Sequence, residues 1–320
     1  MDIIKSGTSI NFMGQRKIAL GLSVALIVLS IVSLAVRGLD FGLDFTGGTL
    51  IEISYPSPPE LGEVRSTLTS EGFEDFTVQT FGSAREIVVR IPAGESVESG
   101  ADLSTRVLEA LSDGNSGIDL RRVEFVGPQV GQELAEQGGL ALLYALFGIL
   151  IYVSFRFQWR FAVGAVAALI HDVIIVMGLI SLFGMSFDLT VVAAILAVIG
   201  YSLNDTIVVY DRLRENFRVK RKGTAIELTN LSVNQMLGRT LMTSLTTMAV
   251  LVALFYFGGE IIHAFAYTLI MGVLVGTYSS IYIAGNAAIL LGVSKQDLMP
   301  VEKEGADQPD MEAVPERFRR

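Results

Sequence analysis

Cysteine is absent from this 320-residue sequence, and histidine occurs only twice, as His171 and His263. The lack of cysteine excludes disulfide frameworks, thiolate metal sites and cysteine nucleophiles. Two histidines so far apart in the sequence do not indicate a histidine-rich metal site. The phosphate-binding pattern G-x-x-x-x-G-K-[ST] is missing as well, so nothing in the sequence indicates ATP hydrolysis. We therefore expect no metal site, no cofactor and no enzymatic activity.

Charged residues are also scarce. They make up 18% of the chain, whereas hydrophobic residues make up 51% and the mean hydropathy is +0.53. A soluble domain usually carries about 25% charged residues. Here the apolar residues gather in runs of about 20, the length that a helix needs to cross a hydrocarbon core of about 30 Å. The composition therefore predicts a polytopic α-helical membrane protein.

Six apolar runs are present, and each predicts one membrane-spanning helix. Lys and Arg residues precede the first span, lie between the second and third, and follow the fourth, whereas the short connections at 184–188 and 258–261 contain neither. Because cytoplasmic loops carry the excess of Lys and Arg, we expect both termini to be cytoplasmic. The predicted spans are 18–36, 139–155, 161–183, 189–210, 240–257 and 262–285.

The first span has an alternative interpretation as a cleaved signal peptide, because small residues at 33–35 resemble a cleavage site. Its apolar stretch is longer than the about 7–15 residues of a signal-peptide core, and Arg37 follows it directly. We therefore expect an uncleaved anchor.

Residues 38–137 form an acidic segment, with 18 Asp and Glu against six Arg and no Lys. This balance argues against nucleic acid as a partner, because phosphate binding needs clustered cations. Its periodicity predicts the order β-α-β-β-α-β of a ferredoxin-like α+β domain. The segment shows no catalytic cluster, and its acidity is more typical of a solvated surface than of a binding site. The predicted strands are 49–55, 76–81, 86–91 and 118–126, and the helices are 59–71 and 102–111.

Four regions follow from these patterns. We expect a cytoplasmic N-terminus with the first span at 1–37, an external domain at 38–137, and a bundle of the other five spans at 138–291. The polar, acidic segment 292–320 predicts a disordered cytoplasmic tail.

Ionisable residues inside the predicted spans carry the functional signal. Asp172 lies near the middle of the third span, directly after His171. Asp205 follows Asn204 in the cytoplasmic half of the fourth span. A carboxylate at the centre of a span costs about 2.5–3.5 kcal/mol, so such residues usually face the bundle interior and often lie on ion or proton paths. We interpret Asp205 as a functional buried carboxylate rather than a solvated helix end, because three apolar residues follow it.

The other polar residues of the spans leave alternatives open. Because adjacent helical residues point about 100° apart, His171 and Asp172 need not pair, and either an interhelical hydrogen bond or a proton relay fits them. Arg239 begins the fifth span and should lie within a few turns of the depth of Asp205. Hydroxyl residues below it, spaced as on one helix face, fit either tight helix packing or a hydrated groove. They are Thr240, Ser244 and Thr247.

Two glycine patterns concern packing. Gly272 and Gly276 permit a close helix contact in the sixth span, although G-x-x-x-G is a common pattern. Gly200, one turn before Asn204, is interpreted as a position that loosens the fourth span.

Three motifs together resemble the SecF family, the smaller subunit of the bacterial SecDF accessory complex, which belongs to the RND superfamily. They are FGLDFTGG at 41–48, VGPQVG at 126–131 and IGYSLNDTIVVYDR at 199–212. The layout of six spans with one large external loop also fits, so the resemblance covers nearly the whole chain. It implies a proton path through Asp205 and Arg239. Asn204, Asp172 and His171 are further relay candidates because of their positions in the spans. It implies a structural role for the motif residues Asp44, Gly47, Gly48, Gly127, Pro128 and Gly200.

The resemblance also implies a function and partners. SecF-like proteins promote late-stage protein export across the bacterial inner membrane and draw on the proton motive force. The implied partners are SecD, the SecYEG translocon, YajC, YidC, the translocating polypeptide and membrane lipid, and no nucleic acid. A pseudo-symmetric partner half is also a natural way to bury interior carboxylates that six helices enclose poorly.

Two other functions remain as alternatives. A small-molecule exporter of the RND type usually needs a second large external loop, and here the other external connections are about five residues long. A structural subunit of the translocon that conducts no protons is compatible with the sequence. Neither the coupling ion, H⁺ or Na⁺, nor the stoichiometry follows from the residues.

Overall fold

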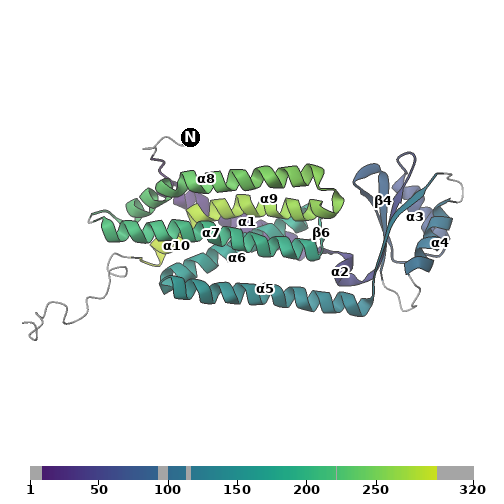
Figure 1. The fold of residues 1–320 in the computed structure, drawn as a ribbon, viewed down its shortest axis with the longest axis horizontal. Helices are drawn as coiled ribbons and strands as arrows, with labels where there is room; N and C mark the ends of the chain where they lie inside the picture. The colour runs from purple at the N-terminus through teal and green to yellow at the C-terminus, as the bar shows by residue number, and fades with distance from the viewer. Residues whose placement is uncertain (1–8, 93–99, 113–116, 221, 294–320) are drawn as a thin grey trace, which may run out of the picture.

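The computed structural model describes residues 9–92, 100–112, 117–220 and 222–293. It consists of a bundle of long helices and a small α/β domain at one end of the bundle (Figure 1). The predicted tail 292–320 lies almost entirely outside the described residues.

Six helices of the described chain are long and apolar enough to cross a membrane, which confirms the predicted number of spans. The sixth span is composite, because α9 continues through a π-helical segment, η2, into α10. A short 3₁₀ turn, η1 (Met13–Gln15), precedes the first span. The helices of the bundle are α1 (Arg16–Val36), α5 (Pro128–Arg156), α6 (Trp159–Phe183), α7 (Leu189–Val219), α8 (Ala225–Phe257), α9 (Glu260–Ser279), η2 (Ser280–Ala284) and α10 (Gly285–Leu290).

Three of these helices, α5, α7 and α8, extend well beyond the predicted apolar runs. Helices α7 and α8 have 31 and 33 residues, and at 1.5 Å per residue they reach about 46 and 50 Å. The C-terminal end of α7 and the N-terminal end of α8 are rich in polar and charged residues, so hydropathy did not assign these ends to the spans. Helix α8 begins with a capping box between Thr224 and Glu227. Helix α5 begins at Pro128, so the predicted boundary at 137 falls inside this helix.

The centre of the bundle is formed by α6, α7 and α9. About half of the most apolar window of α6 and of α7 is buried, whereas only 6% of that window is buried in α5 and 17% in α8. A methyl group on Gly272 would lie 2.0 Å from Cγ2 of Val198, so α9 lies against α7 at the closest distance a glycine allows. The close contact predicted from the G-x-x-x-G pattern is therefore confirmed.

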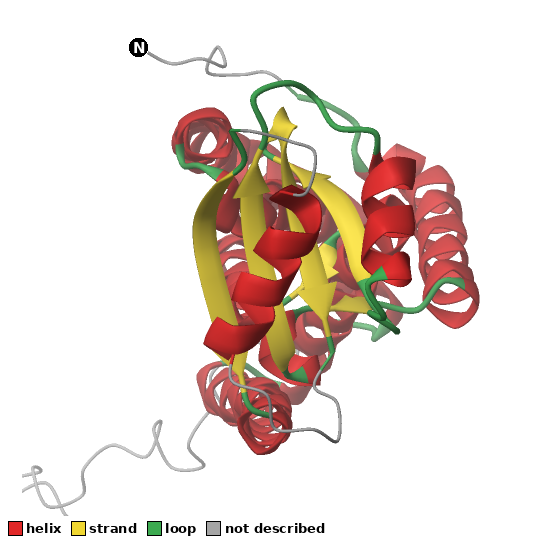
Figure 2. Cartoon of the chain, turned by 90° about the vertical axis from the view of Figure 1, so that its right-hand side faces the viewer, coloured by secondary structure: helices red, strands yellow, loops and turns green. Residues whose placement is uncertain are grey.

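The α/β domain has the ferredoxin-like order that the sequence predicted. Its four-stranded sheet has the order β3-β4-β2-β5, and every neighbouring pair is antiparallel. The two helices cover the face of the sheet that points away from the bundle (Figures 1 and 2). Apolar side chains between sheet and helices form the core, among them Ile51, Ile53, Leu68 and Val107. The elements are β2 (Gly48–Ser54), α3 (Leu61–Ser70), β3 (Thr77–Phe81), β4 (Ser83–Ile91), α4 (Gly100–Ser112) and β5 (Asp119–Val126).

A small joint that the sequence did not predict lies between the two parts. Strand β1 (Asp40–Phe41) pairs in parallel with β6 (Ser186–Phe187), which belongs to the connection between α6 and α7. The single-turn helix α2 (Leu43–Thr46) follows β1. Gly47 and Gly48 then take φ values of 66° and 122°, a conformation that favours glycine, and lead into β2.

Candidate functional site

Asp205 lies on the interior side of α7. The residue is only 2% exposed, and among the described residues its Oδ2 atom has no hydrogen-bond partner. A buried carboxylate oxygen without a partner is costly, and the cost is much larger when the group is charged. The structure thus places a carboxylate where a change of protonation or a change of partner alters its energy strongly.

Arg239 lies at the same depth on the neighbouring helix. Asp205 is 14 residues before the end of α7 at Val219, and Arg239 is 14 residues after the start of α8 at Ala225. Both distances correspond to about 21 Å along the helix axes. The charge of Arg239 acts on Asp205, although the guanidinium group is exposed in the single chain.

A cavity of about 410 Å³ lies between the half of α7 that ends at Val219 and the half of α8 that begins at Ala225. Asn204 and Arg239 line its inner end, whereas Asp211, Arg212 and Glu215 line it nearer the end of α7. The structure therefore brings Asn204 and Arg239 to one cavity, with Asp205 on the adjacent, buried side of the same helix turn.

The hydroxyl residues of α8 face the bundle interior. Thr240 is 2% exposed, and the Oγ atom of Ser244 lies 2.8 Å from Oγ1 of Thr277 on α9. The hydroxyl of Tyr201, one turn before Asp205, donates to the same Ser244 at 3.2 Å. These contacts connect α7, α8 and α9 by hydrogen bonds.

Asp172 is fully buried and, unlike Asp205, has partners on both oxygens. Its Oδ2 atom accepts hydrogen bonds from Ser202 on α7 at 2.5 Å and from Ser279 on α9 at 2.7 Å. Its Oδ1 atom lies 2.8 Å from Nδ1 of His171, whose Nε2 atom has no partner among the described residues. The structure thus brings His171 and Asp172 together, and it adds two serines whose contacts depend on tertiary packing.

The predicted structural motifs meet at the joint below the α/β domain. The Oδ2 atom of Asp44 accepts a hydrogen bond from the backbone amide of Leu189, the first residue of α7. A Cβ atom on Gly47 would lie 3.1 Å from Cα of Pro128, which places the two glycine motifs against each other. Gly127 is the N-cap residue of α5, and Pro128 is the first residue of this helix. Gly200 is different, because α7 continues without interruption there and open space surrounds its Cα atom.

Sequence reasoning missed an ion pair at the end of the bundle that lies away from the α/β domain (Figure 1). Arg156, the last residue of α5, lies 2.7 Å from Oδ2 of Asp211 on α7. Both residues were visible as charges next to spans, but only the packing of α5 on α7 joins them.

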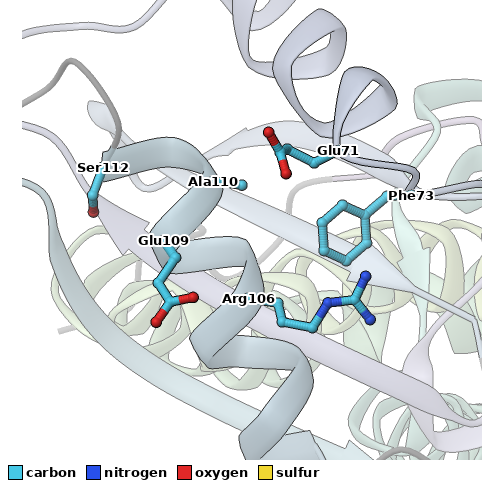
Figure 3. Close-up of a pocket in the computed structure, with 6 residues that line it drawn as sticks. All are labelled: Glu71, Phe73, Arg106, Glu109, Ala110 and Ser112. Atoms are coloured by element: carbon cyan, nitrogen blue, oxygen red, sulfur yellow. The ribbon is translucent and has the colours of Figure 1, made fainter.

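A second cavity lies in the α/β domain. It has a volume of about 580 Å³ and lies at the ends of α3 and α4, where Arg106 packs over the ring of Phe73 at 5.1 Å (Figure 3). Glu71 and Glu109 contribute the charges around it. Among the described residues, no group of three or more His, Cys, Asp and Glu residues is placed to hold a metal ion.

The fold defines a polytopic membrane protein with six spans and one ferredoxin-like domain inserted after the first. The family described as "Protein export membrane protein SecD/SecF, C-terminal" matches residues 106–294, and the "SecD/SecF GG Motif" matches residues 32–55. Among curated relatives, the protein translocase subunit SecF of Pseudomonas aeruginosa is 53% identical, over 93% of this chain and 96% of its own length. The SecF subunit of Vibrio alginolyticus is 52% identical, over 97% of this chain and 99% of its own. The chain belongs to the SecF family of protein translocase subunits.

Solved structures agree with this assignment. The crystal structure of SecDF from Thermus thermophilus matches with a TM-score of 0.82 and 36% identity, over 90% of this chain and 39% of that chain. A second structure, SecDF in a super-membrane-facing form, matches with a TM-score of 0.67 at the same identity and coverage. This chain therefore spans about two fifths of the length of the solved SecDF chains.

Proposed function

We propose that this chain is the SecF half of a SecDF-type accessory complex that uses the proton motive force to promote late-stage protein export across the bacterial inner membrane. Both termini are cytoplasmic and the domain 38–137 is periplasmic. The distribution of Lys and Arg along the chain supports this orientation. The names of its relatives as protein translocase subunits support the role in export.

The observation that carries the proton-coupled part of the proposal is the unpaired oxygen of Asp205. In its neutral form this carboxyl group is compatible with burial, whereas in its ionised form it needs the opposite charge of Arg239. Protonation and deprotonation therefore favour different packings of α7 against α8. One proton that crosses about 100 mV releases about 2.3 kcal/mol, which is enough to bias a two-state element.

His171 and Asp172 assist rather than exchange the main proton. Because both oxygens of Asp172 have partners, a change of its charge would break contacts among α6, α7 and α9. The cavity at Asn204 supports entry of protons from the cytoplasmic side. Asp205 is therefore the exchanging group, Arg239 adjusts it, and the Asp172 cluster keeps the three helices in register.

The exposed positions beside the site support a partner subunit. Asn204 and Arg239 are exposed at mid-helix, and α5 and α8 bury little of their apolar surface within this chain. A charged group facing lipid at this depth is costly, so a second membrane subunit is needed to enclose it. SecD fills this position, since the solved SecDF chains are much longer than this one. SecYEG, YajC, YidC and the translocating polypeptide complete the set of proposed partners.

The test is the substitution Asp205→Asn in the complex with its partner subunit, reconstituted in vesicles with a translocon and an ATP-driven export motor. We expect normal assembly, loss of proton flux and loss of the gradient-dependent stimulation of export. The matched control is Asp211→Asn, which changes a carboxylate on the same helix that is partly exposed and paired with Arg156. Export stimulation equal to wild type in the Asp205 variant would instead support a structural subunit that conducts no protons.

A further inference from the structure

The first turn of α7 is held by two carboxylates of different origin. Asp188 directly precedes the helix, and its Oδ1 atom accepts from the backbone amide of Val191 at 2.9 Å, which is an ordinary N-cap. Asp44 comes from α2, 145 residues earlier in the sequence, and its Oδ2 atom accepts from the amide of Leu189 at 3.0 Å. Asp188 therefore stabilises α7 alone, whereas Asp44 also fixes α7 to another part of the molecule.

That other part is the joint formed by β1, α2 and β6. The backbone amide of Gly42 donates to the carbonyl of Phe187 at 2.8 Å, directly beside the Asp44 contact. Phe45 of α2 stacks on Phe187, with ring centroids 5.7 Å apart. These contacts hold α2 and β6 together as one unit, and the Asp44 hydrogen bond joins that unit to the first turn of α7.

The external sheet continues directly from this unit. Gly47 and Gly48 connect α2 to β2, and Gly48 pairs with Val126 at the end of β5. A Cβ atom on Gly131 would lie 2.9 Å from the amide nitrogen of Gly47, so the start of α5 is packed tightly on the same point. Both chain connections to the sheet therefore leave from one place, next to α2.

A side chain of the sheet contacts the joint as well. Arg90 on β4 donates from Nη2 to the hydroxyl of Ser186 at 2.8 Å, and its Nη1 atom lies 3.9 Å from Oδ2 of Asp40. The sheet thus follows the joint through its backbone connections and through Arg90.

We propose that Asp44 is a coupling residue, which transmits a displacement of α7 to the external domain. Asp205 lies 16 residues after Leu189, about 24 Å along the same helix. A continuous helix moves as a rod, so a change of packing at Asp205 displaces the first turn of α7. The Asp44 contact converts that displacement into a tilt of the sheet about the Gly47–Gly48 connection. This inference rests on the proposed proton-coupled function and adds the residue that links its two ends.

The absence of native cysteine allows a direct test in the full chain with its partner subunit. Spin labels are attached to cysteines introduced by Gln79→Cys on β3 and Phe183→Cys at the end of α6, both of which are exposed. The distance distribution between the labels is compared with and without Asp205→Asn, which imitates the protonated state. We expect this substitution to shift the distribution when Asp44 is present and to leave it unshifted in the Asp44→Ala background.

Export measurements separate coupling from stability. We expect Asp44→Ala to lower gradient-dependent export about tenfold, the factor that a hydrogen bond to a charged group is worth, while proton flux persists. Asp44→Asn keeps an oxygen that accepts from Leu189, and it should retain most of the coupling. The matched control is Asp188→Ala, which removes the carboxylate cap of the same helix turn but keeps the Cβ atom that lies beside Gly42, and it should leave coupling near wild type.

Several outcomes would overturn the proposal. It fails if Asp205→Asn still shifts the label distance in the Asp44→Ala background, or if Asp188→Ala and Asp44→Ala impair export equally. It also fails if the protein with Asp44 conducts protons but Asp205→Asn does not shift its label distance. Failure of the proposed proton-coupled function would give a different result. In that case the Asp205→Asn variant has normal proton flux and normal export, whichever residue occupies position 44.

Discussion

The hydroxyl of Ser202 donates a 2.5 Å hydrogen bond to Oδ2 of Asp172, whereas one turn further along the same helix the Oδ2 atom of Asp205 has no partner among the described residues. Two buried aspartates at the centre of the bundle thus have opposite surroundings. Asp172 is held by His171, Ser202 and Ser279, whereas the Oδ2 atom of Asp205 is free to take a new partner. Under the proposed function, this difference assigns Asp172 a structural role and Asp205 the exchange of protons, although the sequence shows both as an acid in an apolar helix.

The two aspartates should therefore differ in their effect on stability. Asp172→Asn replaces an acceptor of two serine hydroxyls by a group that also donates, and leaves buried polar atoms without partners. We expect a loss of about 1–3 kcal/mol in the free energy of unfolding. Asp205→Asn should change stability little or increase it, because it removes a buried charge whose Oδ2 atom has no hydrogen-bond partner among the described residues. Thermal unfolding of the two variants in the same detergent measures the difference, and equal destabilisation would contradict it.

Arg239 should act through its charge. Arg239→Ala leaves the ionised form of Asp205 without a nearby cation, so we expect loss of gradient-dependent export. Arg239→Lys keeps the positive charge but not the planar group, and should retain part of the stimulation. Arg212→Ala is the matched control, since Arg212 lines the same cavity but is paired with Glu215 and Gln235. A loss of export in the Arg212 variant equal to that in the Arg239→Ala variant would show that the cavity, not the position of the charge, is what matters.

The close contact between α7 and α9 should be sensitive to a single methyl group. In Gly272→Ala the new Cβ atom would collide with Val198, and overpacking of this kind costs about 1–3 kcal/mol. Gly148→Ala on α5 is the control, because open space surrounds that glycine. The yield of folded complex and its melting temperature in detergent report the effect. If Gly272→Ala melts at the same temperature as Gly148→Ala, the two helices are not held as close as the structure shows.

The elements built from local periodicity could be predicted from the sequence. Alternating apolar residues predict the strands of the α/β domain, and long apolar runs predict the six spans. The polar extensions of α7 and α8 were missed because hydropathy marks only the part of a helix that meets lipid. The contacts of Asp44 with Leu189 and of Asp172 with Ser279 join residues more than 100 positions apart. Such contacts depend on how the helices pack, so the sequence indicates the residues without indicating their partners.

Tyr55 provides a pH-dependent test of the α/β domain. It follows β2 and is 7% exposed, and burial raises the pKa of its hydroxyl to about 12. The hydroxyl of Tyr55 ionises less easily in the folded domain than in the unfolded chain. Its contribution to stability is therefore complete below about pH 10, the ordinary pKa of tyrosine, and is lost as the pH rises toward about 12. In this window the free energy of unfolding should fall by at most about 1.4 kcal/mol per pH unit.

Tyr55→Phe keeps the ring in the core and should remove this contribution, so hydrogen exchange in β2 and β4 becomes less sensitive to alkali than in the wild type. The comparison is made at each pH between the two proteins, so that effects of other groups cancel. Tyr144→Phe on α5, where the ring is 67% exposed, is the control and should leave the profile of the sheet unchanged. Identical alkaline profiles for wild type and Tyr55→Phe would mean that the hydroxyl of Tyr55 ionises as easily in the folded domain as in the unfolded chain.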